Sequence, residues 1–86
     1  MAETDTAATA PATDGESDFR QGLVALLPHL RAFARGLCRR PDLADDLVQE
    51  AVMRAWSGRA GFAPGTNLRA WTFTILRNHY LNTLRH

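Results

Sequence analysis

The apolar residues of this chain recur at steps of three and four positions, which is the spacing that most restricts its fold. Between residues 17 and 39 the large apolar residues form one such stripe: Phe19, Leu23, Leu26, Leu27, Leu30, Phe33 and Leu37. Side chains spaced in this way share one face of an α-helix, and no strand-like alternation extends beyond a few residues. We therefore expect an all-α protein that forms a compact bundle of three to four helices.

Capping and helix-breaking residues mark the expected ends of the helices. Ser17 or Asp18 can cap the first helix, in which Pro28 predicts a kink or the start of a second segment. Thr66 or Asn67 can cap the last helix, after a loop rich in glycine and proline that cannot continue the helix before it. The three expected helices lie at about residues 17–39, 42–57 and 67–85.

The first 18 residues contain no aromatic or branched aliphatic side chain, and they carry five acids and no base. Such a segment buries too little apolar surface to offset the entropy cost of ordering. We therefore predict a disordered acidic tail at residues 1–17 and a single domain at residues 18–86. The tail has neither the basic start nor the apolar run of a secretory signal, and no later stretch is apolar enough to span a membrane, so we expect a cytoplasmic protein.

The charge is distributed unevenly along the chain. From Ala51 onward there are five arginines and no acid. A stretch of one sign attracts phosphate groups or an acidic partner, although a solvated helix surface is the alternative explanation.

The residues that carry catalytic or metal chemistry form no recognisable pattern. Cys38 is the single cysteine, and it has no metal-ligand spacing with the three histidines. The sequence also lacks a phosphate-binding glycine loop and a nucleophile with its base. We expect no enzymatic activity, no bound metal and no cofactor.

The helix expected at residues 42–57 has two different faces. Leu43, Leu47, Val48, Ala51 and Ala55 form its apolar side. Hydrogen-bond acceptors gather on the other side, at Asp46, Gln49 and Glu50, with Met53 beside them. Acids near the start of a helix also suit its dipole, which explains Asp46 but not the continuation to Glu50.

The string Asp46-Leu47-Val48-Gln49-Glu50 resembles region 2.2 of bacterial sigma factors. Four later residues are similar to regions 2.3 and 2.4 of the extracytoplasmic-function (ECF) group: Trp71, Ile75, Arg77 and Asn78. The similarity covers roughly residues 19–85. Three blocks, at residues 27–35, 44–50 and 64–71, resemble the EcfG-type general stress response sigma factors.

The resemblance implies a domain of a transcription initiation factor that binds RNA polymerase and promoter DNA. In this family the region 2.2 helix docks on the clamp helices of the polymerase β′ subunit, and the matching positions here are Asp46, Gln49, Glu50 and Met53. Carboxylates and an amide on one helical face are suitable acceptors for arginine side chains.

The resemblance also implies that the loop at residues 58–67 captures a flipped base from the non-template strand of the promoter −10 element. Phe62 can stack on such a base, while Thr66 and Asn67 can bond to its edge. A structural role is equally open for these residues, because Phe62 can seal the core and Asn67 can cap a helix.

On the last helix, Asn78, Asn82 and Arg85 follow at i, i+4 and i+7 and so share one flank, as donors for phosphates or base edges. Arg69 and Arg77 flank another side and suit the DNA backbone or an anti-sigma factor. Trp71 is expected in the core rather than on DNA.

The chain stops at His86, where the sigma factors that it resembles continue to region 4. We therefore expect an isolated, monomeric region 2, without region 4, that binds −10 single strand weakly. The alternative is a sigma-like decoy that binds an anti-sigma factor without DNA. A decoy can lose the acceptor face and the Arg/Asn helix, and this sequence keeps both.

Overall fold

The computed structural model describes residues 2–85 and the side chains from Gly15 onward. It contains three α-helices and one short 3₁₀-helix: α1 (Ala2–Cys38), α2 (Pro41–Ser57), η1 (Arg59–Gly61) and α3 (Leu68–Leu84). The described residues contain no β-strand, which confirms the predicted all-α fold. Within this part of the chain, no helix combines the length and the apolar character that crossing a membrane requires.

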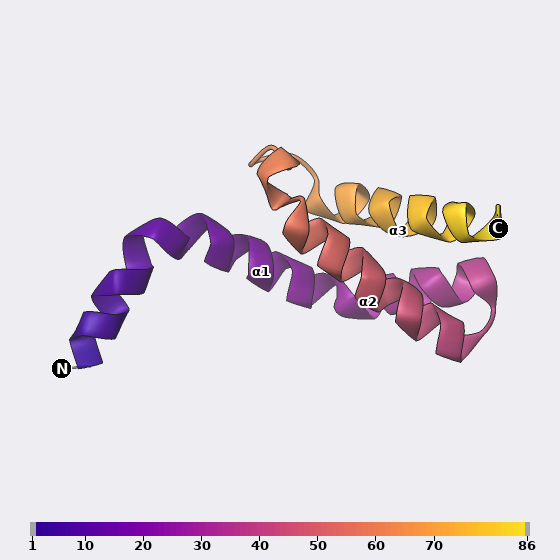
Figure 1. Cartoon of the computed structure of the whole chain (residues 1–86), viewed down its shortest axis with the longest axis horizontal. Helices are drawn as coiled ribbons and strands as arrows, with labels where there is room; N and C mark the ends of the chain where they lie inside the picture. The colour runs from indigo at the N-terminus through magenta and orange to yellow at the C-terminus, as the bar shows by residue number, and fades with distance from the viewer. Residues whose placement is uncertain (1, 86) are drawn as a thin grey trace.

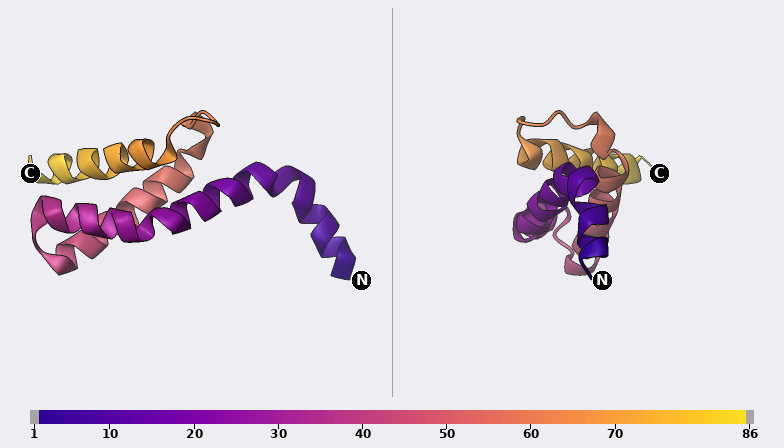
Figure 2. Two further views of the ribbon diagram at one scale, coloured as in Figure 1. Left: turned by 180° about the vertical axis from the view of Figure 1, so that it is seen from behind. Right: turned by 90° about the vertical axis from the view of Figure 1, so that its left-hand side faces the viewer.

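The three helices form a bundle in which every pair is in contact. α1 and α3 run in the same direction and α2 runs back, as Figures 1 and 2 show from three sides. The 58–67 loop and the turn between α1 and α2 therefore lie at opposite ends of α2.

The first helix begins earlier than its sequence predicts. α1 starts at Ala2, so Ser17 and Asp18 both lie inside the helix and neither caps its start. The helix also continues through Pro28 without a break. The side chains of residues 1–14 lie outside the described part, so the disordered tail expected at residues 1–17 stays a prediction. Gly15 and Glu16 are described, and both are helical.

The other boundaries lie close to their predicted positions. α1 ends at Cys38, after which Arg39 takes the left-handed conformation that commonly terminates a helix, with a φ of 60°. Pro41 occupies the first turn of α2, where its missing N–H costs nothing. Asn67 caps α3 as predicted, because its side chain accepts a hydrogen bond from the Ala70 amide.

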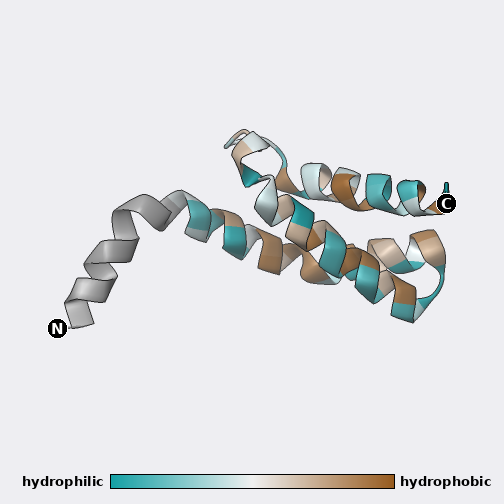
Figure 3. Ribbon diagram, viewed as in Figure 1, coloured by the Kyte–Doolittle hydropathy of each residue, from teal (hydrophilic) through white to brown (hydrophobic). Residues whose placement is uncertain are grey.

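The central core lies where the three helices meet. Its buried residues are Leu30, Ala34, Ala44, Leu47, Val48, Ala51 and Leu76. α2 supplies most of them, and hydrophobic and hydrophilic residues alternate along it at helical spacing (Figure 3). The prediction of a buried face on α2 is confirmed, with the difference that Leu43 at its start is only partly buried. Each fully buried leucine contributes about 1.5 to 3 kcal/mol relative to an exposed one.

A second cluster closes the end of the bundle beside the loop. It is built on Phe19, Leu23 and Ala55, with Trp56, Phe62, Leu68 and Trp71 packed around them. Gly22 allows α1 to approach the start of α3, because a Cβ atom at this position would lie 2.6 Å from Leu68 Cδ2. This cluster holds the loop against α1.

Among residues 15–85, one polar side chain is buried, and it suggests a stability test. Thr72 is fully buried on α3, and its hydroxyl has no hydrogen-bond partner among the described residues. A valine of the same shape removes the unsatisfied group, so Thr72→Val should raise the free energy of unfolding by about 1 kcal/mol. Urea denaturation measures this change. Thr74→Val is the matched control, because the Thr74 hydroxyl is exposed and donates to the Ala70 carbonyl. A loss of stability in Thr72→Val would contradict the assignment.

Candidate nucleic-acid interface

The loop between α2 and α3 is folded by its own hydrogen bonds. It begins with the single turn of η1, and the Thr66 amide donates to the Ala63 carbonyl at 3.1 Å. Gly65 has a φ of +87°, a conformation that other residues adopt only with strain. These features agree with the predicted surface loop.

Phe62 points from this loop into the aromatic cluster. Its ring centroid lies 5.7 Å from that of Phe19 and 5.1 Å from that of Trp71. Phe62 is therefore half-buried and seals the end of the core, which is the structural alternative that the sequence left open. Trp71 also packs on Phe19, as expected for a core residue.

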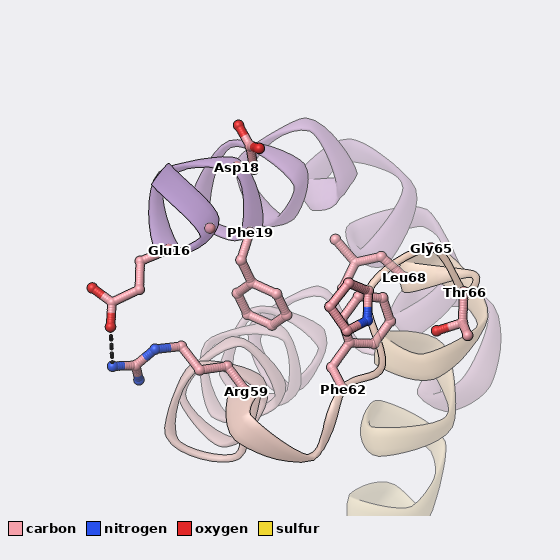
Figure 4. Close-up of a pocket in the computed structure, with 10 residues that line it drawn as sticks. Glu16, Asp18, Phe19, Arg59, Phe62, Gly65, Thr66 and Leu68 are labelled. Atoms are coloured by element: carbon pink, nitrogen blue, oxygen red, sulfur yellow. Dashed lines mark hydrogen bonds and ion pairs between the residues drawn. The ribbon is translucent and has the colours of Figure 1, made fainter. Parts of the chain in front are cut away.

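A pocket of about 570 Å³ lies between the 58–67 loop and α1 (Figure 4). Phe19 and Leu68 contribute apolar surface, while Thr66 and Arg59 contribute polar groups. This volume is within the range of sites that admit a small organic ligand, and the lining combines apolar surface with a few polar groups. The pocket is thus chemically suited to a planar heterocycle with a polar edge.

Thr66 and Asn67 use only part of their hydrogen-bonding capacity within the protein. The Thr66 hydroxyl donates to the Ala63 carbonyl at 2.6 Å, and its oxygen remains an acceptor. The Asn67 carbonyl oxygen accepts from the Ala70 amide, and its NH₂ group keeps two donors. Both residues are exposed, so a ligand can reach them.

The predicted contacts on α3 are all solvent-exposed. Asn78, Asn82 and Arg85 lie along one flank of the helix, as their spacing requires. Arg77 and Arg69 are displaced from this flank around the helix, and the Arg69 guanidinium lies 5.3 Å from the centre of the Phe73 ring. None of these three arginines forms an ion pair with any residue from 15 to 85. Within that range a phosphate group can approach these charges without displacing a carboxylate.

The acceptor face of α2 is also accessible. Asp46, Gln49 and Met53 are exposed, and Glu50 is half-buried and accepts from Arg54 Nε at 2.9 Å. Gln49 and Met53 also line a groove of about 590 Å³ between α1 and α2. The four predicted docking residues therefore form one continuous surface that combines acceptors with an apolar edge.

Arg59 belongs to the loop site, although the sequence did not single it out. It lines the same pocket as Phe62 and donates to a carboxylate oxygen of Glu16 at 2.8 Å. The sequence gives no signal for this contact, because the two residues lie 43 positions apart and Glu16 falls in the segment assigned to the tail.

Residues 23–86 match the family model of sigma-70 region 2. The chain belongs to this family. It is 48% identical over 75 residues to the ECF RNA polymerase sigma factor EcfG of Rhodopseudomonas palustris. The matched region covers 87% of this chain and 40% of that relative. The chain is 32% identical over 74 residues to the RNA polymerase sigma factor CarQ of Myxococcus xanthus, which covers 85% of the chain and 42% of that relative.

A solved structure also resembles this sigma region 2 chain. The sigma factor RpoE of Bartonella quintana, in complex with the anti-sigma factor NepR, superimposes with a TM-score of 0.75 at 50% identity, over 79% of the chain and 42% of RpoE. The chain thus spans about two fifths of the length of these relatives. Sigma factors are not enzymes, in agreement with the prediction from the sequence.

The position of Phe62 leads to a test of its packing. Phe62→Ala should lower the free energy of unfolding by about 2 kcal/mol, less than for a fully buried phenylalanine, because the ring is half-buried. Thermal denaturation followed by circular dichroism measures the change. Met53→Ala is the control, since Met53 is 63% exposed and its truncation should change stability by no more than about 0.5 kcal/mol. Equal stability of Phe62→Ala and the wild type would show that the ring does not support the core.

Proposed function

We propose that this chain is the region 2 domain of an ECF sigma factor, which acts in transcription initiation. In this proposal α2 docks on the clamp helices of the RNA polymerase β′ subunit. The 58–67 loop captures a flipped base from the non-template strand of the promoter −10 element, and α3 contacts the adjoining DNA.

The observation that carries the DNA part of the proposal is the pocket beside the loop. A base must leave its stack before a protein can hold it in a pocket, and it is then held by shape, stacking and hydrogen bonds to its edge. The pocket has apolar surface from Phe19 and polar atoms on Thr66. Phe62 packs into the aromatic cluster beneath this surface. In this proposal only the exposed part of its ring touches the captured base.

The polar and basic side chains of α3 support the same proposal. The part of the chain that follows Ala51 carries arginines and no acid, and α3 presents Asn78, Asn82 and Arg85 along one flank. Arginine suits phosphate, whereas asparagine suits the edges of bases. This flank begins roughly 15 Å along the helix from Leu68 at the pocket, at 1.5 Å per residue, and runs to the far end of α3. A single strand that places one base in the pocket and then follows α3 can reach both.

The docking part of the proposal rests on the exposed acceptor face of α2. Asp46 and Gln49 form no side-chain hydrogen bond with any residue from 15 to 85, so they can accept from basic side chains of a partner. Glu50 forms an i,i+4 ion pair with Arg54 at the protein surface. Such a pair is weak, so a basic side chain of the partner can replace Arg54.

An anti-sigma factor is a further proposed partner, because the Bartonella quintana relative was solved with one. The alternative of a decoy that binds an anti-sigma factor without DNA has less support. The DNA-contact candidates on α3 and the docking face on α2 are both exposed, and a decoy requires neither.

The docking surface can be tested with a combined variant. Asp46→Ala, Gln49→Ala and Glu50→Ala together should weaken binding to a β′ clamp-helix fragment by about tenfold or more, which is about 1.4 kcal/mol. Folding should be retained because none of the three supports the core. Isothermal titration calorimetry measures the affinity. Asn78→Ala with Asn82→Ala is the control, since it removes exposed polar groups from α3 and should leave docking unchanged. Equal affinity of the triple variant and the wild type would refute the docking assignment.

The DNA interface can be tested without knowing the promoter. Selection from a random pool of short single-stranded DNAs should enrich a defined sequence, and the chain should bind it more tightly than the matching duplex. Because arginines contact phosphates, affinity should fall with salt with a slope of about −0.7 per neutralised phosphate.

Two variants separate base reading from phosphate binding in the same assay. Asn82→Ala should reduce sequence preference by about 1 to 3 kcal/mol if it bonds a base edge. Arg85→Ala should weaken binding to all sequences by the same factor. Tighter binding to duplex, or an unchanged sequence preference after replacement of the 58–67 loop, would count against the mechanism.

A further inference from the structure

Arg59 is held in a defined position beside the loop pocket. Its guanidinium lies 4.0 Å from the centre of the Trp56 ring, and its Nη1 donates to the Trp56 carbonyl at 2.7 Å. A cation over the face of a tryptophan is attracted by the ring, and the added hydrogen bond fixes its orientation. Arg59 is thus held more firmly than Arg69 of α3, whose guanidinium lies 5.3 Å from the Phe73 ring.

The remaining contact of Arg59 is with an acid from a distant part of the chain. Its Nη2 donates to Glu16 Oε2 at 2.8 Å, and both residues line the pocket (Figure 4). The side chains of Arg59 and Glu16 are 33% and 42% exposed. The ion pair therefore lies at the surface, where solvent and a ligand can reach it.

The chemistry of this pair resembles that of a phosphate site occupied by a carboxylate. A guanidinium has five N–H donors, of which the two named bonds use two. Its fork binds carboxylates and phosphates with similar geometry. A nucleotide whose base enters the pocket brings its own phosphate close to the pocket rim, where Arg59 lies.

We propose that Arg59 binds a backbone phosphate of the captured single strand, and that Glu16 competes with that phosphate as an internal anion. The inference rests on the proposed function of the loop pocket. Glu16 holds Arg59 when DNA is absent and is displaced when DNA binds. The acid therefore lowers the affinity for single strands that use Arg59.

The strength of the ion pair is compatible with such an exchange. A partly exposed pair changes an equilibrium constant by at most about fivefold. A phosphate that carries a full charge can replace it, because the stacked position of Arg59 on Trp56 does not depend on Glu16. The competition adjusts affinity and does not block the site.

Glu16→Gln tests the competition, because it removes the charge and keeps the size of the side chain. The probe is a fluorescein-labelled single-stranded DNA enriched from a random pool on the wild-type chain, and fluorescence anisotropy measures its binding. Glu16→Gln should bind about two- to fivefold more tightly at low salt. The slope of affinity against salt should become steeper by up to about 0.7.

Asp18→Asn is the matched control for general charge. Asp18 lines the same pocket but points away from Arg59 (Figure 4), and it forms no ion pair with residues 15–85. Removing its charge should change affinity less than Glu16→Gln does. Equal gains from the two variants would show that only the net charge matters and would overturn the proposal.

Arg59→Gln completes a double-mutant cycle. Arg59→Gln alone should weaken binding and flatten the salt dependence, and Glu16→Gln should have no further effect in its presence. A gain that persists without Arg59, or an unchanged affinity in Glu16→Gln, would overturn the competition. The fold of each variant is checked by circular dichroism.

Binding by the wild type shows whether a negative result counts against this inference or against the proposed function. If the wild type prefers its selected single strand over duplex and Glu16→Gln has no effect, the competition alone fails. If neither the wild type nor Glu16→Gln binds any single strand, the DNA part of the proposed function fails and the inference fails with it.

Discussion

The arrangement of the candidate site depends on the packing of Phe19 against aromatic rings from three other parts of the chain. Its ring contacts Trp56 at the end of α2, Phe62 in the loop and Trp71 in α3, at centroid distances of 5.7 to 6.1 Å. Aromatic pairs at such distances are stabilised by edge contacts beyond the area that they bury. Because these contacts join α1 to the loop, they place the pocket and its lining residues.

Much of the fold could be predicted from the sequence because its signals are local. The three- and four-residue spacing of apolar side chains indicates helices and their buried faces, and Asn67 carries its own capping group. The exposed faces followed from the same spacing, so the accessibility of Asp46, Gln49 and Asn82 was expected. The roles of these residues came from the resemblance to sigma factors, and exposure alone does not test them.

The parts that could not be predicted depend on tertiary contacts. Ser17 has the chemistry of a helix cap, yet α1 continues through it, since a good capping residue does not oblige a helix to start. An aromatic residue in a loop can either pack in the core or stack on a base of the DNA. The positions of Phe19 and Trp71 show that Phe62 packs inward. The Glu16 to Arg59 ion pair joins segments that no pattern in the sequence relates to each other.

α2 connects the two proposed interfaces as one rigid element. Its buried side is anchored in the central core by Leu47 and Ala51 and in the aromatic cluster by Ala55, so the helix cannot turn or slide without breaking both. From Gln49 to the end of the helix at Ser57 the rise is roughly 12 Å, at 1.5 Å per residue. If the acceptor face docks on polymerase as proposed, the loop pocket is held at a set distance from the docked surface. Base capture then depends on where the polymerase presents the unpaired strand, and the pocket needs only moderate affinity of its own.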